Sequence, residues 1–192
     1  SSGSWNADGS GSYTNADGSS GSWEPDGSGT WIDAEGNSST WDADGNSSYT
    51  NADGSSGSWN ADGSGSYTNA DGSSGTYNAD GSGTWTDING NSSTWDAEGN
   101  GSYTNADGSS GSWNADGSGT WTDADGNSST WDAEGNGSYS NADGSSGTYN
   151  VDGSGSYTDP EGNTDTWGAT DSTYASDSTY EETDAQKDEI PA

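Results

Sequence analysis

The chain has 192 residues, with 33 Asp and Glu against a single Lys or Arg, and its formal net charge at pH 7 is −32. Nothing in it could neutralise phosphates, which excludes nucleic acid and anionic membrane surfaces as partners. It has no Cys or His, and its carboxylates repeat in identical surroundings, so we expect no disulfide scaffold and no enzyme. No long apolar run predicts insertion into a membrane.

A four-residue motif recurs every nine residues, eighteen times, from Asn6–Gly9 to Asp159–Gly162. Its fourth residue is always Gly, and its second is Pro in two copies, Pro25 and Pro160. Proline fixes φ near the value required at the second position of a type I turn. A type I turn followed by a left-handed Gly is a hairpin loop with a G1 bulge. The motif therefore predicts a β-hairpin every nine residues.

Between turns lie five-residue segments, beginning with 1–5, 10–14 and 19–23, and each carries one Trp or Tyr at its fifth or fourth position in alternation. An odd period would flip side chains between faces on successive strands, and the shift of the aromatic by one position cancels that flip. All aromatics should then share one face, with glycines opposite them across the strands. This predicted aromatic packing face consists of Trp5, Tyr13, Trp23, Trp31, Trp41, Tyr49, Trp59, Tyr67, Tyr77, Trp85, Trp95, Tyr103, Trp113, Trp121, Trp131, Tyr139, Tyr149, Tyr157 and Trp167.

These patterns predict an all-β fold, a repetitive antiparallel meander or ribbon of about 19 short strands joined by type I turns with G1 bulges. An alternative with the same period is a β-solenoid or β-roll with 18 residues per coil. Residues 77–112 and 113–148 differ at only five positions, which indicates internal duplication. We expect a repeat array over 1–167 and an acidic Ser/Thr/Tyr tail over 168–192, acting as a cap or assembly segment.

The acidic turns are candidate cation sites, with Asp8, Asp17, Asp44 and Asp53 as the weak candidates. Gly/Asp repeats of this period resemble the calcium β-roll of secreted bacterial toxins, whose motif is GGxGxD, but this chain has one acid before its glycines. Asn or Asp at the first turn position also hydrogen-bonds its own turn backbone. We therefore expect no cofactor, with loosely bound Ca²⁺ or other cations as the alternative.

Six Asn-x-Ser sequences are candidate N-glycosylation sites, and each follows a turn Gly. The alternative is a polar residue at the start of a strand. The candidate residues are Asn37, Asn46, Asn91, Asn100, Asn127 and Asn136.

An aromatic face on a single sheet needs a cover, and unblocked strand edges recruit further strands. From this we predict a structural subunit of an extracellular or cell-surface fibre or filament. Its partner would be its own copies, glycans are a candidate modification, and its acidity is compatible with a high-salt environment. The alternative function is a repeat module that binds calcium, or a surface such as ice or polysaccharide.

Overall fold

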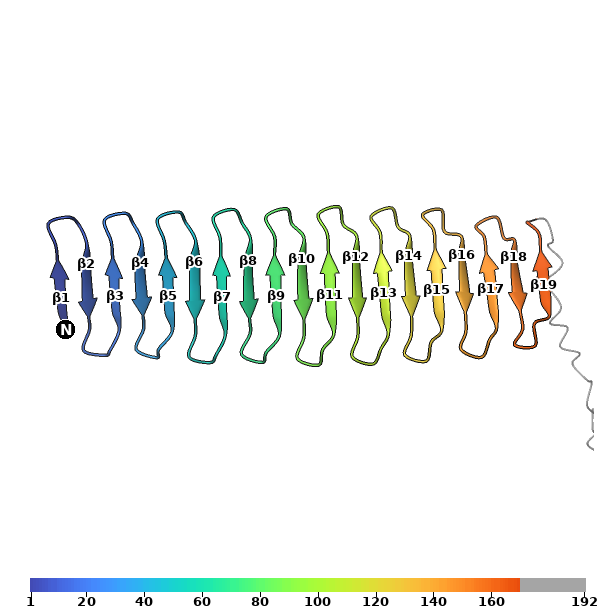
Figure 1. Ribbon diagram of the computed structural model, residues 1–192, viewed down its shortest axis with the longest axis horizontal. Coiled ribbons are helices and arrows are strands. Elements are labelled where there is room, and N and C mark those ends of the chain that lie inside the picture. Colours follow the sequence, from blue (N-terminus) through green and yellow to red (C-terminus); the bar gives the residue numbers. More distant parts are fainter. Residues whose placement is uncertain (170–192) are drawn as a thin grey trace, which may run out of the picture.

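The computed structural model describes residues 1–169, which form a single open antiparallel sheet of nineteen strands (Figure 1). Each strand pairs with its neighbours in sequence, from β1 with β2 to β18 with β19. The strands are β1 (Ser2–Trp5), β2 (Gly11–Thr14), β3 (Ser20–Trp23), β4 (Gly29–Ile32), β5 (Ser38–Trp41), β6 (Ser47–Thr50), β7 (Ser56–Trp59), β8 (Gly65–Thr68), β9 (Ser74–Tyr77), β10 (Gly83–Thr86), β11 (Ser92–Trp95), β12 (Gly101–Thr104), β13 (Ser110–Trp113), β14 (Gly119–Thr122), β15 (Ser128–Trp131), β16 (Gly137–Ser140), β17 (Ser146–Tyr149), β18 (Gly155–Thr158) and β19 (Thr164–Trp167). The predicted meander is confirmed, and the alternative 18-residue coil is not formed over these residues.

The turns between strands share one backbone geometry. In the first, the Asn6 N–H donates to the carbonyl of Ser10 at 2.9 Å, and the Gly9 N–H donates to the carbonyl of Asn6 at 3.1 Å. The turn glycines have φ between 84° and 94°, the left-handed conformation that a G1 bulge requires. The type I turn with a bulge, predicted from the recurring Gly, is confirmed.

The strand register divides the sheet into two unlike faces. Trp5 pairs with Gly11, and Tyr13 pairs with Gly3 and Gly21, so aromatic residues and glycines alternate on one face. The other face, here called the hydroxyl face, consists mostly of Ser and Thr. Their hydroxyls hydrogen-bond across the strands, as between Ser4 and Ser12 at 2.9 Å.

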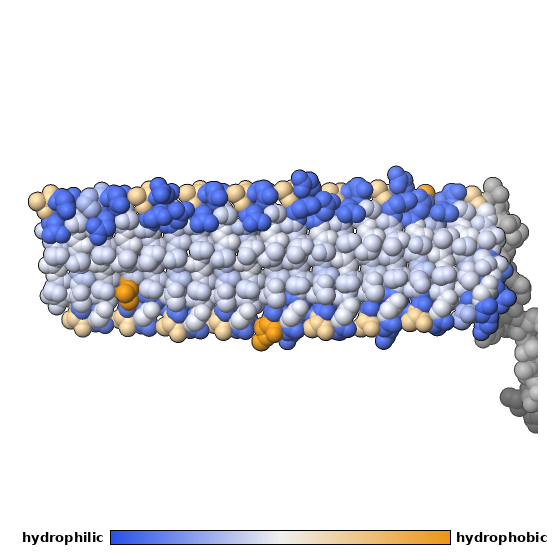
Figure 2. All heavy atoms as spheres, in the orientation of Figure 1, coloured by the Kyte–Doolittle hydropathy of each residue, from blue (hydrophilic) through white to orange (hydrophobic). Residues whose placement is uncertain are grey.

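The sheet has no second layer among the described residues, and none of their hydrophobic side chains is buried. Successive turns alternate between the two long edges of the ribbon. Figure 2 shows strongly hydrophilic residues along both edges, interspersed with small hydrophobic ones, and a paler band between the edges. No helix in residues 1–169 could cross a membrane. Of the predicted tail, all but residues 168–169 lies outside the described residues.

Candidate functional site

Many of the aromatic rings lie flat on glycines of a neighbouring strand. A Cβ atom added to Gly21 would lie 2.6 Å from Cε1 of Tyr13, and one added to Gly29 would lie 2.5 Å from Cζ2 of Trp41. Such distances leave no room for a side chain, so each glycine serves as a seat for a ring. The seated rings lose one face to the sheet and keep the other exposed.

Rings at the fifth strand position mostly lean toward the preceding strand. Trp23 lies over Gly11, and its indole N–H donates to the carbonyl of the turn residue Gly9 at 3.0 Å. Trp41 lies over Gly29 and donates to the carbonyl of Gly27 in the same way. The same indole bond recurs at Trp95 and Trp131. These bonds hold the rings in a regular row.

Trp59 breaks this row. Its partner on the preceding strand is Ser47 instead of a glycine, and its ring lies over Gly65 of the following strand, with Cε3 2.8 Å from the place of a Cβ atom. Gly65 is also the partner of Tyr77. Because Trp59 occupies that glycine, Tyr77 packs against Trp59 instead, with ring centroids 6.1 Å apart and an interplanar angle of 17°.

A cluster of three aromatic rings results from this reversal. Tyr67 also stacks on Tyr77, with ring centroids 6.1 Å apart and an interplanar angle of 26°. Partial desolvation raises the pKa of the Tyr67 hydroxyl, and the neighbouring Tyr77 raises it further.

A groove opens where the row is broken, and we call it the aromatic groove. Its volume is about 650 Å³. Its lining residues are Tyr49, Trp59, Gly63, Tyr67, Asn69, Tyr77, Asn78, Ala79 and Gly81. The groove thus combines the faces and edges of aromatic rings with backbone and amide groups of the adjacent turns.

The turns along both edges carry fixed negative charge, held in one of two ways. Where Ser follows the turn Gly, the third turn residue is the acceptor: Asp62 accepts bonds from the hydroxyl and the N–H of Ser64, at 2.7 and 2.9 Å. Where Asn follows the Gly, the first turn residue is the acceptor, and Asp42 accepts two bonds from Asn46. These bonds lower the pKa of Asp62 and Asp42, chiefly through the Ser64 and Asn46 side chains.

The candidate cation ligands do not come together. Asp8, Asp17 and Asp53 each accept hydrogen bonds from the Ser that follows their own turn, whereas Asp44 accepts none of these bonds. Residues 1–169 contain no group of three or more His, Cys, Asp or Glu that could hold a metal ion. The predicted carboxylates therefore lie singly along the edges.

The six candidate glycosylation residues have a structural role that was not predicted from the sequence. Asn37 donates its Nδ2 to Asp33 at 2.6 Å, and its Oδ1 accepts the N–H of Ala52 in the next turn on the same edge at 2.9 Å. We call this arrangement the turn clamp. Its other members are Asn46, Asn91, Asn100, Asn127 and Asn136. The sequence does contain a signal for the Asn–Asp part of this arrangement, because Asn follows the Gly in every turn that begins with Asp. Glycosylation of these residues stays a prediction.

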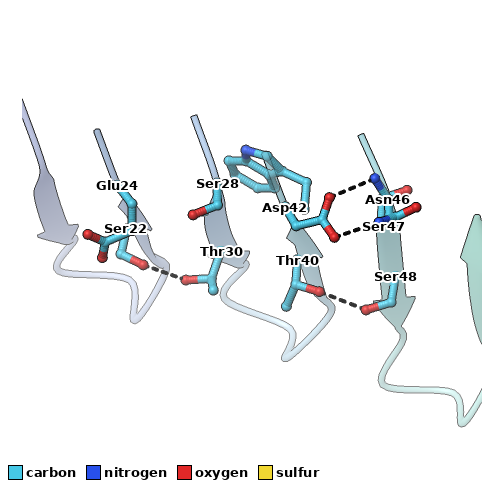
Figure 3. A pocket seen from close by; sticks show the side chains of 11 residues that line it. Ser22, Glu24, Ser28, Thr30, Thr40, Asp42, Asn46, Ser47 and Ser48 are labelled. Carbon is cyan, nitrogen blue, oxygen red and sulfur yellow. Dashed lines mark hydrogen bonds between the residues drawn. The ribbon is translucent and has the colours of Figure 1, made fainter. Parts of the chain in front are cut away.

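A second hollow lies on the hydroxyl face, near the edge that carries Glu24 and Asp42 (Figure 3). Its polar groups are mostly engaged within the sheet: Thr40 and Ser48 hydrogen-bond each other, and Asp42 accepts its bonds from Asn46. The hollow is therefore a weaker binding candidate than the aromatic groove.

No model of a known protein family matches the sequence, and no curated protein matches it. Solved structures do match in fold. The G-box domain of the microcephaly protein CPAP, for which a role in centriole elongation is suggested, has a TM-score of 0.50 and 17% identity, covering 83% of this chain and 99% of that one. The TCP10 domain of Danio rerio CPAP, in complex with a peptide of STIL, has a TM-score of 0.49 and 18% identity, covering 85% and 96%. At such identities the likeness is one of fold.

These comparisons contradict the function predicted from the sequence. The G-box domain of CPAP is described with a suggested role in centriole elongation. Neither an extracellular glycoprotein filament built from its own copies nor a calcium-, ice- or polysaccharide-binding module matches this description. The predictions of function, partner and extracellular or cell-surface location were therefore wrong. Their basis was the need to cover an aromatic face, and that need alone does not say what covers it.

Proposed function

We propose that this chain is a peptide-binding interaction domain that takes an extended, basic, proline-containing segment on its aromatic face. The observation that carries the proposal is an aromatic face that extends along the sheet with no covering layer among the described residues. Trp31, Trp85 and Trp121 remain 41%, 38% and 41% exposed even with the whole sheet in place. Exposed apolar surface of this extent is typical of interaction sites.

The shape of the face favours an extended ligand. The rings stand in rows on a flat sheet, so a ligand must lie along the surface instead of entering an enclosed cavity. Proline-rich segments in the polyproline II conformation dock on aromatic-lined grooves, and their preformed conformation reduces the entropy lost on binding. The TCP10 domain of Danio rerio CPAP, described with a STIL peptide, makes a peptide a reasonable first ligand to test.

The charge favours a basic ligand. Both edges carry anchored aspartates, represented near the aromatic groove by Asp62 and Asp80, and hydrogen bonds from Ser64 and Ser82 lower the pKa of both. Lys and Arg can pair with these carboxylates at the edge and stack on exposed rings. We propose that binding uses neither catalysis nor a cofactor, and that cations act only as loosely held counter-ions.

The test is a titration of the full chain with three synthetic peptides, one of alternating Lys and Pro, one of alternating Glu and Pro, and one of Lys alone. Tryptophan fluorescence and calorimetry would report binding. We expect saturable binding of the Lys/Pro peptide, weaker binding as salt screens the edges, and none of the Glu/Pro peptide. Failure of the Lys/Pro peptide to bind, or equally tight binding of the Lys peptide, would overturn the proposal.

A further inference from the structure

The aromatic groove has its origin in one residue of the repeat. Ser47 occupies a position at which the two other copies of the 36-residue block have glycine, Gly101 and Gly137. In those copies the glycine is a seat: a Cβ atom on Gly101 would clash with Cζ2 of Trp113, and one on Gly137 would clash with Cζ of Tyr149. Trp59 is the corresponding aromatic beside Ser47.

The serine removes the seat and thereby sets the direction of the ring. Trp59 cannot lie over Ser47 as Trp113 lies over Gly101, because a side chain already fills that space. It turns to Gly65, and the displaced rings of Trp59 and Tyr77 both line the groove, although Ser47 itself is not a lining residue. Ser47 is exposed, whereas Gly101 is half-buried beneath its ring. The groove is therefore a built feature, specified by the sequence at one point of an otherwise regular array.

We infer that the aromatic groove is the anchor site of the face, and that it holds a proline ring with a Lys or Arg next to it. This inference rests on the proposed function. A proline ring is small and apolar enough to pack on the aromatic rings that line the groove, among them Tyr49 and Trp59. Two of the turns that line the groove, one through Gly63 and one through Asn78, Ala79 and Gly81, also contain Asp62 and Asp80, which accept hydrogen bonds from Ser64 and Ser82 and adjoin lining residues along the chain. An adjacent basic residue then meets negative charge within reach of its long side chain.

The test is Ser47→Gly, which restores a seat beneath Trp59 and should close the groove. The matched control is Ser129→Gly, on the same face opposite Trp121 and outside the groove. Both variants replace Ser by Gly opposite a Trp of the aromatic face, and circular dichroism should show that both keep the β-sheet. We expect Ser47→Gly to weaken binding of the Lys/Pro peptide about tenfold, the size of effect seen when an aromatic anchor is lost, and Ser129→Gly to bind as the unaltered chain does.

A gain-of-site variant makes the test independent of destabilisation. Gly101→Ser places a serine beside Trp113, and we expect a second groove and a second bound peptide by calorimetry. Unchanged affinity in Ser47→Gly, with the unaltered chain still binding the peptide, would overturn the groove as anchor and leave the proposed function intact. Absence of binding to the unaltered chain would instead refute the proposed function. Dimers of the free chain by light scattering, with the groove closed to peptide, would also overturn the assignment.

Discussion

At the scale of single residues, two hydrogen-bonding schemes explain which acid occurs where in the turns. Turns followed by Ser use the third residue as acceptor, and that residue is Asp throughout. Turns followed by Asn use the first residue as acceptor, which leaves the third free to vary. The variants that depart from Asp at the third position, such as Glu35, Glu98 and Asn89, all lie in turns of this second kind.

The two hydrogen-bonding schemes predict different results for the same Asp-to-Glu substitution at two candidate cation ligands. Asp53 accepts bonds from the hydroxyl and the N–H of Ser55, at 2.7 and 2.9 Å, so the longer side chain of Asp53→Glu should disturb both bonds and lower the melting temperature. Asp44→Glu should leave the melting temperature unchanged, because Asp42 carries the bonds to Asn46 in that turn. Thermal unfolding followed by circular dichroism measures both, and equal effects would contradict the two schemes.

At the scale of the strand pair, rings seated on glycines replace a conventional core. A β-strand glycine is normally unfavourable, but here the ring of the neighbouring strand covers it and recovers part of the loss. The turn clamp adds a second link between hairpins, because each clamp Asn connects two turns of one edge through its side chain, as Asn100 does with Asp96 and the N–H of Ala115. Stability thus arises from contacts between neighbours along the ribbon.

Replacement of a strand glycine should therefore lower the stability more where a ring lies over the glycine than where no ring does. In Gly111→Ala the new methyl group would lie 2.6 Å from Cε1 of Tyr103, and we expect a loss of about 1–3 kcal/mol, as for other overpacked sites. In Gly3→Ala the nearest atom is the carbonyl oxygen of Ser12 at 3.2 Å and no ring lies over the site, so a smaller loss is expected. Denaturant unfolding of both variants is the measurement. A larger loss in Gly3→Ala would contradict the role of the seats.

At the scale of the whole molecule, the meander and its register could be predicted because they follow from local rules. The recurring turn Gly fixes the hairpin, and the one-position shift of the aromatic fixes the face. The reversal of Trp59 was not predicted, although Ser47 marks it in the sequence, because it depends on competition between Trp59 and Tyr77 for Gly65. The occupant of the face was predicted wrongly, since an exposed aromatic surface does not itself distinguish a second copy from a foreign peptide.

Acidification provides a test of the whole ribbon, because eighteen aspartates contribute in the same direction. Hydrogen bonds from Ser or Asn lower their pKa in the folded chain below the ordinary value of 3.8, as at Asp62 and Asp132. The folded chain then binds fewer protons than the unfolded chain near this pH. The stability from these bonds is fully present above the unfolded value and is lost as pH falls through the folded values.

Relief of charge repulsion acts in the opposite direction, since the chain carries a net charge of −32 at pH 7. High salt separates the two effects: it screens repulsion between exposed carboxylates but leaves the short turn bonds in place. We therefore expect that in about 1 M salt, where the screening length is about 3 Å, the melting temperature falls steadily as pH drops below 3.8. The matched control is Asp44→Glu, which should follow the same curve. A melting temperature that rises throughout acidification at high salt would mean that the turn bonds do not hold the ribbon together.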